Sequence, residues 1–332
     1  MIETDAEAQA AESPFAETDL IITTDDLSKI FGMETAVDHL NLEVPRGATF
    51  GFIGPSGCGK TTTVRLLLGV YKPSSGTARV LGRDPQHFAR REREKIGYMP
   101  QLFVLYPELT VWENLNFAAS LYGVSWRRSE RLHELLALVE LTEHRNKLVE
   151  HISGGMRRRL SMAAALVHDP QLLFLDEPTA GIDPVLRRTF WDYFERLQEK
   201  GRTLFVTTQY VGEAAYCDYV GVMMNGRLLT VDTPTELRRR ALGGDVVELE
   251  TETYLAPALV EQLKDQQPAV KETSRPSDRT LHLVVDDAST AMPALLGWLQ
   301  QQDIRIVSVT QFLPPFDDVF VRLIEQAQDD VA

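Results

Sequence analysis

The feature that most constrains the fold is a glycine-rich turn with the pattern G-x-x-x-x-G-K-[ST]. It lies between an apolar segment, Ala48–Ile53, and a segment of helical pattern, Thr61–Leu68. Glycines in such a turn let the backbone wrap a phosphate, with N–H groups pointing inward at the N-terminus of the following helix. This context predicts a phosphate-binding loop in an α/β fold. The loop consists of Gly54, Pro55, Ser56, Gly57, Cys58, Gly59, Lys60 and Thr61, and Thr62 follows it.

Two residues of the loop carry the expected chemistry. Lys60 would reach the β- and γ-phosphates of a nucleotide, and the Thr61 hydroxyl would bind Mg²⁺. The competing interpretation is a flexible turn with a surface lysine. It is disfavoured because a strand precedes the loop and a helix follows it. At Cys58 a small side chain simply fits, so we expect no redox role for it.

Phosphoryl transfer needs a second acidic position, and one follows the apolar run Leu172–Leu175. A continuous apolar run bounded by Pro170 and Asp176 predicts a buried parallel strand. We expect Asp176 to hold Mg²⁺ through water and Glu177 to polarise the attacking water as a general base. Two solvated acids at a strand end are the alternative, which the phosphate loop in the same chain disfavours.

The order of the remaining segments places these motifs in a parallel sheet. Asp183-Pro184 opens a helix, with Asp as N-cap and Pro at the first helical position, and Leu204–Thr207 is a further strand. Strand, helix and strand in this order predict a βαβ unit of a P-loop α/β fold. Thr110 and Glu113 have the spacing of a capping box, which opens a helical subdomain of about residues 102–168.

The chain is predicted to form two domains, joined at Gly243-Gly244. Residues 19–242 form the nucleotide-binding domain and carry every motif above. Residues 245–326 follow the order strand, helix, strand, strand, helix, strand, which predicts a small α+β domain of the ferredoxin-like kind. Residues 1–18 are rich in Ala and Glu and predict a disordered acidic tail.

The net charge of −14 is distributed unevenly. Residues 1–20 hold six acidic and no basic residues, residues 241–332 hold 16 and 6, and residues 21–240 hold 26 and 28. The acidic balance argues against a general nucleic-acid binder, while the near-neutral centre suits a polyanionic nucleotide. The basic groups at Arg90–Arg93 and Arg157–Arg159 are interpreted as solvated helix faces, or phosphate and partner contacts.

Signals for membrane insertion, secretion and disulfides are weak. No uninterrupted run of 18 apolar residues occurs, and the first 20 residues lack the basic start and apolar stretch of a signal peptide. Cys58 and Cys217 make no disulfide framework or metal cluster. We therefore expect a chain with no transmembrane helix of its own, in a reducing compartment.

Across residues 20–240 the motifs occur in the order of the ATP-binding subunits of ABC transporters, and the sequence resembles this family. Ile152–Met156 resembles the family signature L-S-G-G-Q, with Ile for Leu and Met for Gln. The resemblance implies that Ser153, Gly154 and Gly155 contact the γ-phosphate of an ATP held by the other subunit of a dimer. Small residues at a helix N-terminus suit this contact.

Three further positions match family motifs. Gln101, after Tyr98-Met99-Pro100, matches the Q-loop glutamine, which would touch Mg²⁺ or water and move with the transmembrane partner. Asp183 matches the D-loop aspartate that faces the partner subunit, and it can also serve as an N-cap. Phe31 matches the aromatic residue that stacks on adenine. A core aromatic is the alternative for a single residue of this type.

The sequence departs from the family pattern at the switch histidine, whose place is taken by Gln209. A glutamine amide can donate a hydrogen bond to a γ-phosphate, but it carries no positive charge and relays no proton. Glutamine at this position resembles the antibiotic-resistance exporter branch of the family. We expect hydrolysis to persist, with Glu177 as the general base.

The segments Thr110–Leu115, Ser153–Leu160 and Phe316–Phe320 resemble ABC-2-type exporter subunits. The resemblance implies an ATPase with ATP and Mg²⁺ as cofactors, a head-to-tail homodimer and an integral membrane permease as partner. It also implies export of a substrate and a cytoplasmic location, peripheral on the inner face of the cell membrane. Leu102–Leu109 would line the groove for a coupling helix of the permease, with ordinary core packing as the alternative.

Two other functions are less well supported. A soluble ABC ATPase acting on DNA would need a long coiled coil, but only 92 residues separate Lys60 and Ser153, without sustained heptads. A ribosome-acting ATPase usually has two cassettes in one chain, and this chain has one. A non-hydrolysing regulatory subunit is disfavoured because Lys60, Asp176 and Glu177 are intact.

Overall fold

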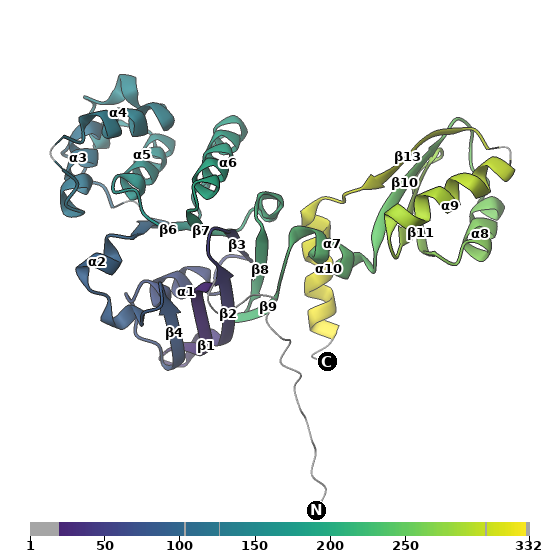
Figure 1. The fold of residues 1–332 in the computed structure, drawn as a ribbon, viewed down its shortest axis with the longest axis horizontal. Helices are drawn as coiled ribbons and strands as arrows, with labels where there is room; N and C mark the ends of the chain where they lie inside the picture. The colour runs from purple at the N-terminus through teal and green to yellow at the C-terminus, as the bar shows by residue number, and fades with distance from the viewer. Residues whose placement is uncertain (1–19, 103, 126, 303, 330–332) are drawn as a thin grey trace, which may run out of the picture. The chain divides into compact units, whose positions relative to one another are not determined.

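The computed structural model of the chain describes residues 20–102, 104–125, 127–302 and 304–329 (Figure 1). Their contacts define two compact units. The first comprises the described residues up to Gln209 together with Gly221–Thr230, and the second comprises Tyr210–Val220 together with the described residues from Val231 onward. The acidic tail predicted for residues 1–18 lies outside the described residues.

A six-stranded sheet with the strand order β5-β6-β7-β3-β8-β9 carries the segments that precede the predicted site motifs. Every residue of β3, β6 and β7 is buried, as expected for strands covered on both faces. The pairs β5–β6, β6–β7 and β3–β7 are parallel, which confirms the predicted α/β class. The strands are β3 (Thr49–Ile53), β5 (Ile96–Met99), β6 (Leu172–Asp176), β7 (Thr203–Thr208), β8 (Tyr219–Met224) and β9 (Arg227–Asp232).

Helices follow the strands where their capping signals predict them. The helix α1 (Lys60–Leu67) begins directly at the glycine-rich loop. Asp183 is the N-cap of α6 (Pro184–Glu199), and its Oδ1 accepts hydrogen bonds from the backbone N–H groups of Val185 and Leu186. One face of α6 buries Phe190 and Phe194. A single-turn helix, α2 (Arg90–Arg93), precedes β5.

The predicted helical subdomain is a cluster of three helices, α3 (Val111–Leu121), α4 (Ser129–Leu138) and α5 (Gly154–Leu166), in which α5 contacts both others (Figure 1). The capping box is present: Thr110 Oγ1 accepts from Glu113 N at 3.2 Å, and Glu113 Oε2 accepts from Thr110 N at 2.8 Å.

A separate antiparallel sheet has the strand order β2-β1-β4. Its strands are β1 (Leu20–Phe31), β2 (Glu34–Pro45) and β4 (Ser75–Val80). The hairpin between β1 and β2 turns at Gly32, where φ is +59°, a region that favours glycine. Phe31 therefore sits at the end of a strand, next to a tight turn.

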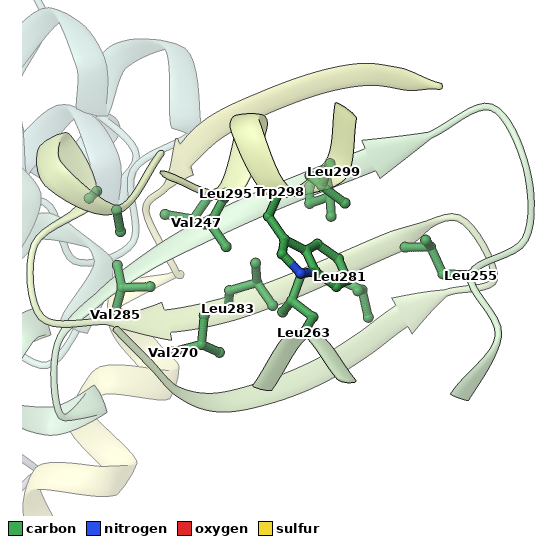
Figure 2. Close-up of a cluster of buried hydrophobic side chains, with 13 residues drawn as sticks. Val247, Leu255, Leu263, Val270, Leu281, Leu283, Val285, Leu295, Trp298 and Leu299 are labelled. Carbon is green, nitrogen blue, oxygen red and sulfur yellow. The ribbon is translucent and has the colours of Figure 1, made fainter. Parts of the chain in front are cut away.

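The second unit contains a four-stranded antiparallel sheet in the order β11-β12-β10-β13. This order, with the chain order strand, helix, strand, strand, helix, strand, is that of a ferredoxin-like module. Its core packs one face of the sheet against two helices around Trp298 and Leu283 (Figure 2). The elements are β10 (Asp245–Thr251), α8 (Pro257–Gln266), β11 (Val270–Ser277), β12 (Thr280–Val285), α9 (Ala288–Gln301) and β13 (Ile306–Phe312).

Two further helices complete the second unit. The helix α10 (Phe316–Asp329) contacts α7 (Pro234–Leu242) and the short 3₁₀ segment Val211–Tyr216. The Arg238 guanidinium lies 5.3 Å from the Phe316 ring centroid, a cation–π contact between α7 and α10. Within the described residues, every helix is too short or too polar to cross a lipid bilayer.

Candidate functional site

Predicted site segments leave the same edge of the six-stranded sheet because they follow parallel strands. The glycine-rich loop follows β3, Gln101 follows β5, Asp176 and Glu177 come at the end of β6, and Gln209 follows β7. In an open parallel sheet, ligands bind outside the carboxyl ends of the strands. The topology therefore gathers residues that are far apart in the sequence.

A cavity of about 240 Å³ lies at this edge. It joins Phe31 of the antiparallel sheet, the glycine-rich loop, Gln101 and Glu177. An aromatic side chain together with loop N–H groups and a lysine in one cavity suits a nucleotide, whose base has a flat aromatic face and whose phosphates are anionic. The lining residues are Phe31, Glu34, Ala36, Ser56, Gly57, Gly59, Lys60, Thr61, Thr62, Gln101 and Glu177.

The loop needs glycine at two places where its backbone runs close to other chain segments. At Gly59 φ is +110°, and a Cβ there would collide with the carbonyl oxygen of Ala36. A Cβ on Gly54 would collide with the carbonyl oxygen of Met223. Gly54 and Gly59 therefore leave no room for a side chain. Because the loop carries no side chains at these two positions, its backbone N–H groups can approach a ligand closely.

Lys60 is held inside the loop and is only 5% exposed. Its Nζ donates to the carbonyl oxygens of Gly54 at 2.7 Å and Pro55 at 3.0 Å. Phosphate oxygens are stronger acceptors for an ammonium than carbonyls, so a bound nucleotide can replace these contacts. Burial raises the pKa of the neighbouring Cys58 thiol, which favours the neutral thiol over the thiolate.

Three side chains form a buried hydrogen-bonded group at the end of β6. Oδ1 of Asp176 accepts from Thr61 Oγ1 at 3.2 Å and from Thr207 Oγ1 at 2.5 Å. The carboxylate is fully buried, and its Oδ2 has no hydrogen-bond partner among the described residues. A buried, unpaired carboxylate oxygen next to a threonine hydroxyl is a donor set that a hard cation such as Mg²⁺ prefers.

Glu177 adopts a left-handed backbone conformation with φ of +51°, which costs a non-glycine residue roughly 1–2 kcal/mol. Its N–H donates to the carbonyl oxygen of Thr207 at 2.9 Å and to Thr207 Oγ1 at 3.1 Å. Oε2 of Glu177 accepts from Nε2 of Gln101 at 3.2 Å. The strained backbone thus aims a carboxylate, only 8% exposed, into the cavity.

The signature, D-loop and switch positions do not line this cavity. Ser153 is the N-cap of α5, accepting from Met156 N at 3.2 Å, and a Cβ on Gly154 would meet open space. Asp183 caps α6, and hydrogen bonds from Leu186 N and Val185 N lower its pKa. The side chain of Gln209 is exposed. The single chain therefore brings the phosphate loop, Gln101 and Glu177 together at one cavity. It does not bring the signature, D-loop and switch residues to that cavity.

Sequence reasoning missed three residues that support the site. Thr207 lies directly opposite Asp176 in the parallel register of β6 and β7, which a strand alignment of the two apolar runs would have indicated. Tyr71 packs edge-on against Phe31, with ring centroids 5.4 Å apart, and the Lys29 ammonium lies 4.9 Å from the Phe31 centroid.

One interpretation was wrong. The sequence predicts that Arg157–Arg159 form a solvated helix face, or make phosphate and partner contacts, but Arg158 is only 4% exposed and its hydrogen bonds go to the backbone of its own chain. Its guanidinium points into the protein because backbone carbonyl oxygens there accept hydrogen bonds from it. The arginines of Arg90–Arg93, in contrast, are exposed as expected.

Comparisons with known proteins agree with the geometry. The model of the ABC transporter family matches residues 37–180. The chain is 38% identical over 312 residues to the daunorubicin/doxorubicin resistance ATP-binding protein DrrA of Streptomyces peucetius, covering 93% of this chain and 94% of that protein. A solved structure described as the ATP-binding subunit of an ABC transporter matches with a TM-score of 0.62 at 29% identity, covering 66% of this chain and 92% of that one.

A further relative is longer than this chain. The probable multidrug ABC transporter ATP-binding protein YbhF of Escherichia coli is 40% identical over 225 residues, which cover 67% of this chain. The matched segment spans only 38% of that relative's length.

Proposed function

Because this chain belongs to the family of ABC transporter ATP-binding subunits, we propose that it hydrolyses ATP to power export of a substrate through a separate membrane-spanning partner. The observation that carries the proposal is the single cavity shared by Phe31, Lys60, Gln101 and Glu177. The names of two relatives, which refer to multidrug transport and to daunorubicin/doxorubicin resistance, support export of a drug-like compound.

In the proposed complex, Phe31 stacks on the adenine and the loop N–H groups hold the phosphates. Lys60 exchanges its contacts with loop carbonyls for the β- and γ-phosphates. Thr61, Asp176 and Gln101 are the residues that would hold Mg²⁺, which neutralises phosphate charge when bound. The unpaired Oδ2 of Asp176 supports this assignment.

Hydrolysis is assigned to the pair formed by Glu177 and Gln101. Glu177 Oε2 takes the proton of the attacking water as a general base, and the Gln101 amide orients the carboxylate and the water. Gln209 donates a hydrogen bond to the γ-phosphate without moving a proton. Glu177 therefore supplies the base, and the substitution of the family's histidine leaves the reaction intact.

Exposure of the signature and D-loop residues supports a head-to-tail dimer. Ser153, Gly154 and Asp183 are exposed and do not line the cavity of their own chain, so small groups at a helix N-terminus can reach the phosphates of a second copy. Each ATP would then lie between the loop of one subunit and the signature of the other. Closure on ATP and reopening after hydrolysis would drive the membrane partner.

An exposed apolar surface after Gln101 supports the membrane partner. Leu102 and Val104 are each 76% exposed, Leu121 is 66% exposed, and Tyr106 packs edge-on against Phe117 with ring centroids 4.9 Å apart. The core-packing alternative for this segment therefore fails at Leu102 and Val104. Such a patch suits an apolar helix face of the permease, which would hold the subunit at the inner face of the cell membrane.

The test is reconstitution of the chain in liposomes with the integral membrane protein that co-purifies with it. We expect ATP-dependent transport of a drug-like compound. Leu102→Asp and Val104→Asp should each abolish this transport and the co-purification with the membrane protein. The basal ATPase activity of both variants should persist. Val70→Asp, at a residue 62% exposed elsewhere, is the matched control. Ribosome association without a membrane partner, or transport that survives both aspartates, would contradict the proposal.

A further inference from the structure

We propose that Arg158 is a positioning residue that ties the helix carrying Ser153–Gly155 to the Gln101–Glu177 pair of the same chain. The inference rests on the proposed function, because it assumes that Glu177 is the base and that Ser153–Gly155 serve the other subunit's nucleotide. It adds a residue to which neither a motif nor the sequence pattern assigned such a role.

The contacts of Arg158 are directed and buried. Its Nη1 donates to the carbonyl oxygen of Gln101 at 2.7 Å, and its Nη2 donates to that of Asp176 at 3.0 Å. Nε lies 3.4 Å from the carbonyl oxygen of Pro178, at the long end of a hydrogen bond. A planar guanidinium is the one side chain that can serve several acceptors in a fixed geometry.

The three acceptors surround the proposed base. Asp176 and Pro178 immediately precede and follow Glu177 in the chain, and Gln101 is its hydrogen-bond donor. Arg158 therefore fixes the backbone on both sides of Glu177 and the backbone of Gln101 with one rigid group. Movement of any of these segments by about 1 Å would misalign the base, an error that can cost about 100-fold in rate.

Burying the charged guanidinium of Arg158 costs desolvation free energy, which other interactions must offset. The guanidinium is buried, and the backbone carbonyl oxygens of Gln101, Asp176 and Pro178 accept its hydrogen bonds. An apolar side chain of similar volume would avoid the desolvation cost. The positive charge and the three carbonyl contacts explain an arginine here in a way that packing alone does not.

Arg158 lies on α5, the helix that also carries the signature residues Ser153–Gly155. Ser153 caps this helix and Gly154 begins it, so the signature and Arg158 lie on one rigid element about one turn apart. A displacement of α5 when Ser153–Gly155 meet the opposite nucleotide is passed to Gln101 and Glu177 through the guanidinium. Each chain thereby couples engagement at one ATP to the alignment of the base at the other.

The test compares Arg158→Met and Arg158→Lys with Arg159→Met in the assembled transporter. Arg159, the next residue on α5, contacts the Val139 carbonyl and the Glu140 carboxylate within the helical subdomain. We measure kcat and KM for ATP, the Kd for a fluorescent ATP analogue and the melting temperature. For Arg158→Met we expect a kcat ~10- to 100-fold lower and an unchanged Kd, because the loop that binds phosphate is untouched.

The conservative variant separates positioning from folding. Arg158→Lys keeps the charge but serves fewer carbonyls, so we expect a kcat between those of Arg158→Met and the wild type, at an unchanged melting temperature. Arg159→Met is expected to keep the wild-type kcat. A folded Arg158→Met with wild-type kcat overturns the inference. If Arg158→Met does not fold, wild-type kcat in Arg158→Lys overturns it.

Two further measurements test the proposed function independently of the Arg158 variants. Light scattering with ATP in the Glu177→Gln background reports the dimer, and the Glu177→Gln turnover reports the base. A chain that stays monomeric, or that hydrolyses ATP without Glu177, refutes the proposed function whatever the Arg158 variants show. A dimer with an inactive Glu177→Gln variant and unaffected Arg158 variants refutes the inference alone.

Discussion

The side-chain amide of Gln101 donates a hydrogen bond of 3.2 Å to Oε2 of Glu177, across 76 positions of sequence. The carbonyl oxygen of the same Gln101 accepts from Arg158, whose guanidinium also binds the backbone next to Glu177. One buried side chain, Arg158, therefore hydrogen-bonds to the backbone of Gln101 and to the backbone next to Glu177. The tertiary structure therefore fixes the position of this pair.

Replacing the base should stop turnover without stopping binding. In Glu177→Gln the amide cannot accept the proton of the attacking water, so we expect kcat to fall by about 10²- to 10⁴-fold. The Kd for ATP should stay within about twofold, because the loop and Phe31 are unchanged. Steady-state ATPase and equilibrium binding of a fluorescent ATP analogue check both quantities.

Two companion variants make this result specific. Glu195→Gln, at an exposed position on α6, is expected to behave as the wild type. Gln209→Ala removes one hydrogen-bond donor and no base, so its kcat should fall much less than that of Glu177→Gln. Equal losses in Gln209→Ala and Glu177→Gln would argue against Glu177 as the sole base.

A side chain at Gly59 should destroy the phosphate loop. Gly59→Ala combines a φ of +110° with a collision against the Ala36 carbonyl, and we expect a loss of ~1–3 kcal/mol in stability together with loss of ATP binding. Chemical denaturation and nucleotide titration measure the two effects. The control is Gly201→Ala, which has a φ of +76° but meets open space, and which should lose stability alone.

The Thr207 hydroxyl should be needed to hold both carboxylate residues. Thr207→Val removes the bonds to Asp176 Oδ1 and to the Glu177 N–H, which we expect to cost ~1–3 kcal/mol of stability and to raise the Mg²⁺ concentration for half-maximal ATPase. Thr207→Ser retains the hydroxyl and should restore both properties. A Val variant with an unchanged Mg²⁺ dependence would show that Thr207 acts on the fold alone.

His168 should make the fold sensitive to mild acid. Its ring stacks on Tyr122 with centroids 3.6 Å apart, its Nε2 lies 3.0 Å from the Ile96 carbonyl oxygen, and its Nδ1 has no partner among the described residues. Burial lowers the pKa of His168 below its ordinary value of 6.5, against smaller opposing contributions from the Ile96 carbonyl, Asp169 and Glu94.

The sign of the effect follows from proton linkage. As pH falls through about 6.5 the unfolded chain binds a proton at His168 that the folded chain resists, so the free energy of unfolding decreases. Denaturant melts between pH 7.5 and 5 should show a smaller loss in His168→Phe than in the wild type. His151→Phe, at an exposed histidine, is the control. Parallel pH curves for the wild type and His168→Phe would refute the assignment.

Local signals in the sequence predicted much of the architecture. The capping residues Thr110 and Asp183 begin the predicted helices, and the run Leu172–Leu175 is a buried strand in a parallel sheet. Such signals act within one turn or one strand, where the chemistry of neighbouring residues decides the conformation. The roles in ATP chemistry that the sequence assigns to the site residues remain predictions, including those of Gln209 and Asp183.

The sequence by itself determined the phosphate loop, the acidic strand end and the family resemblance, because each is a contiguous pattern whose geometry is local. Only the tertiary structure showed that Arg158 is buried and that Thr207 bridges Asp176 and Glu177. A run of three arginines on a helix is most often solvated, and composition does not reveal which carbonyls a fold turns toward it. Contacts across parallel strands and between subdomains depend on register and packing, which arise only when distant segments of the chain meet.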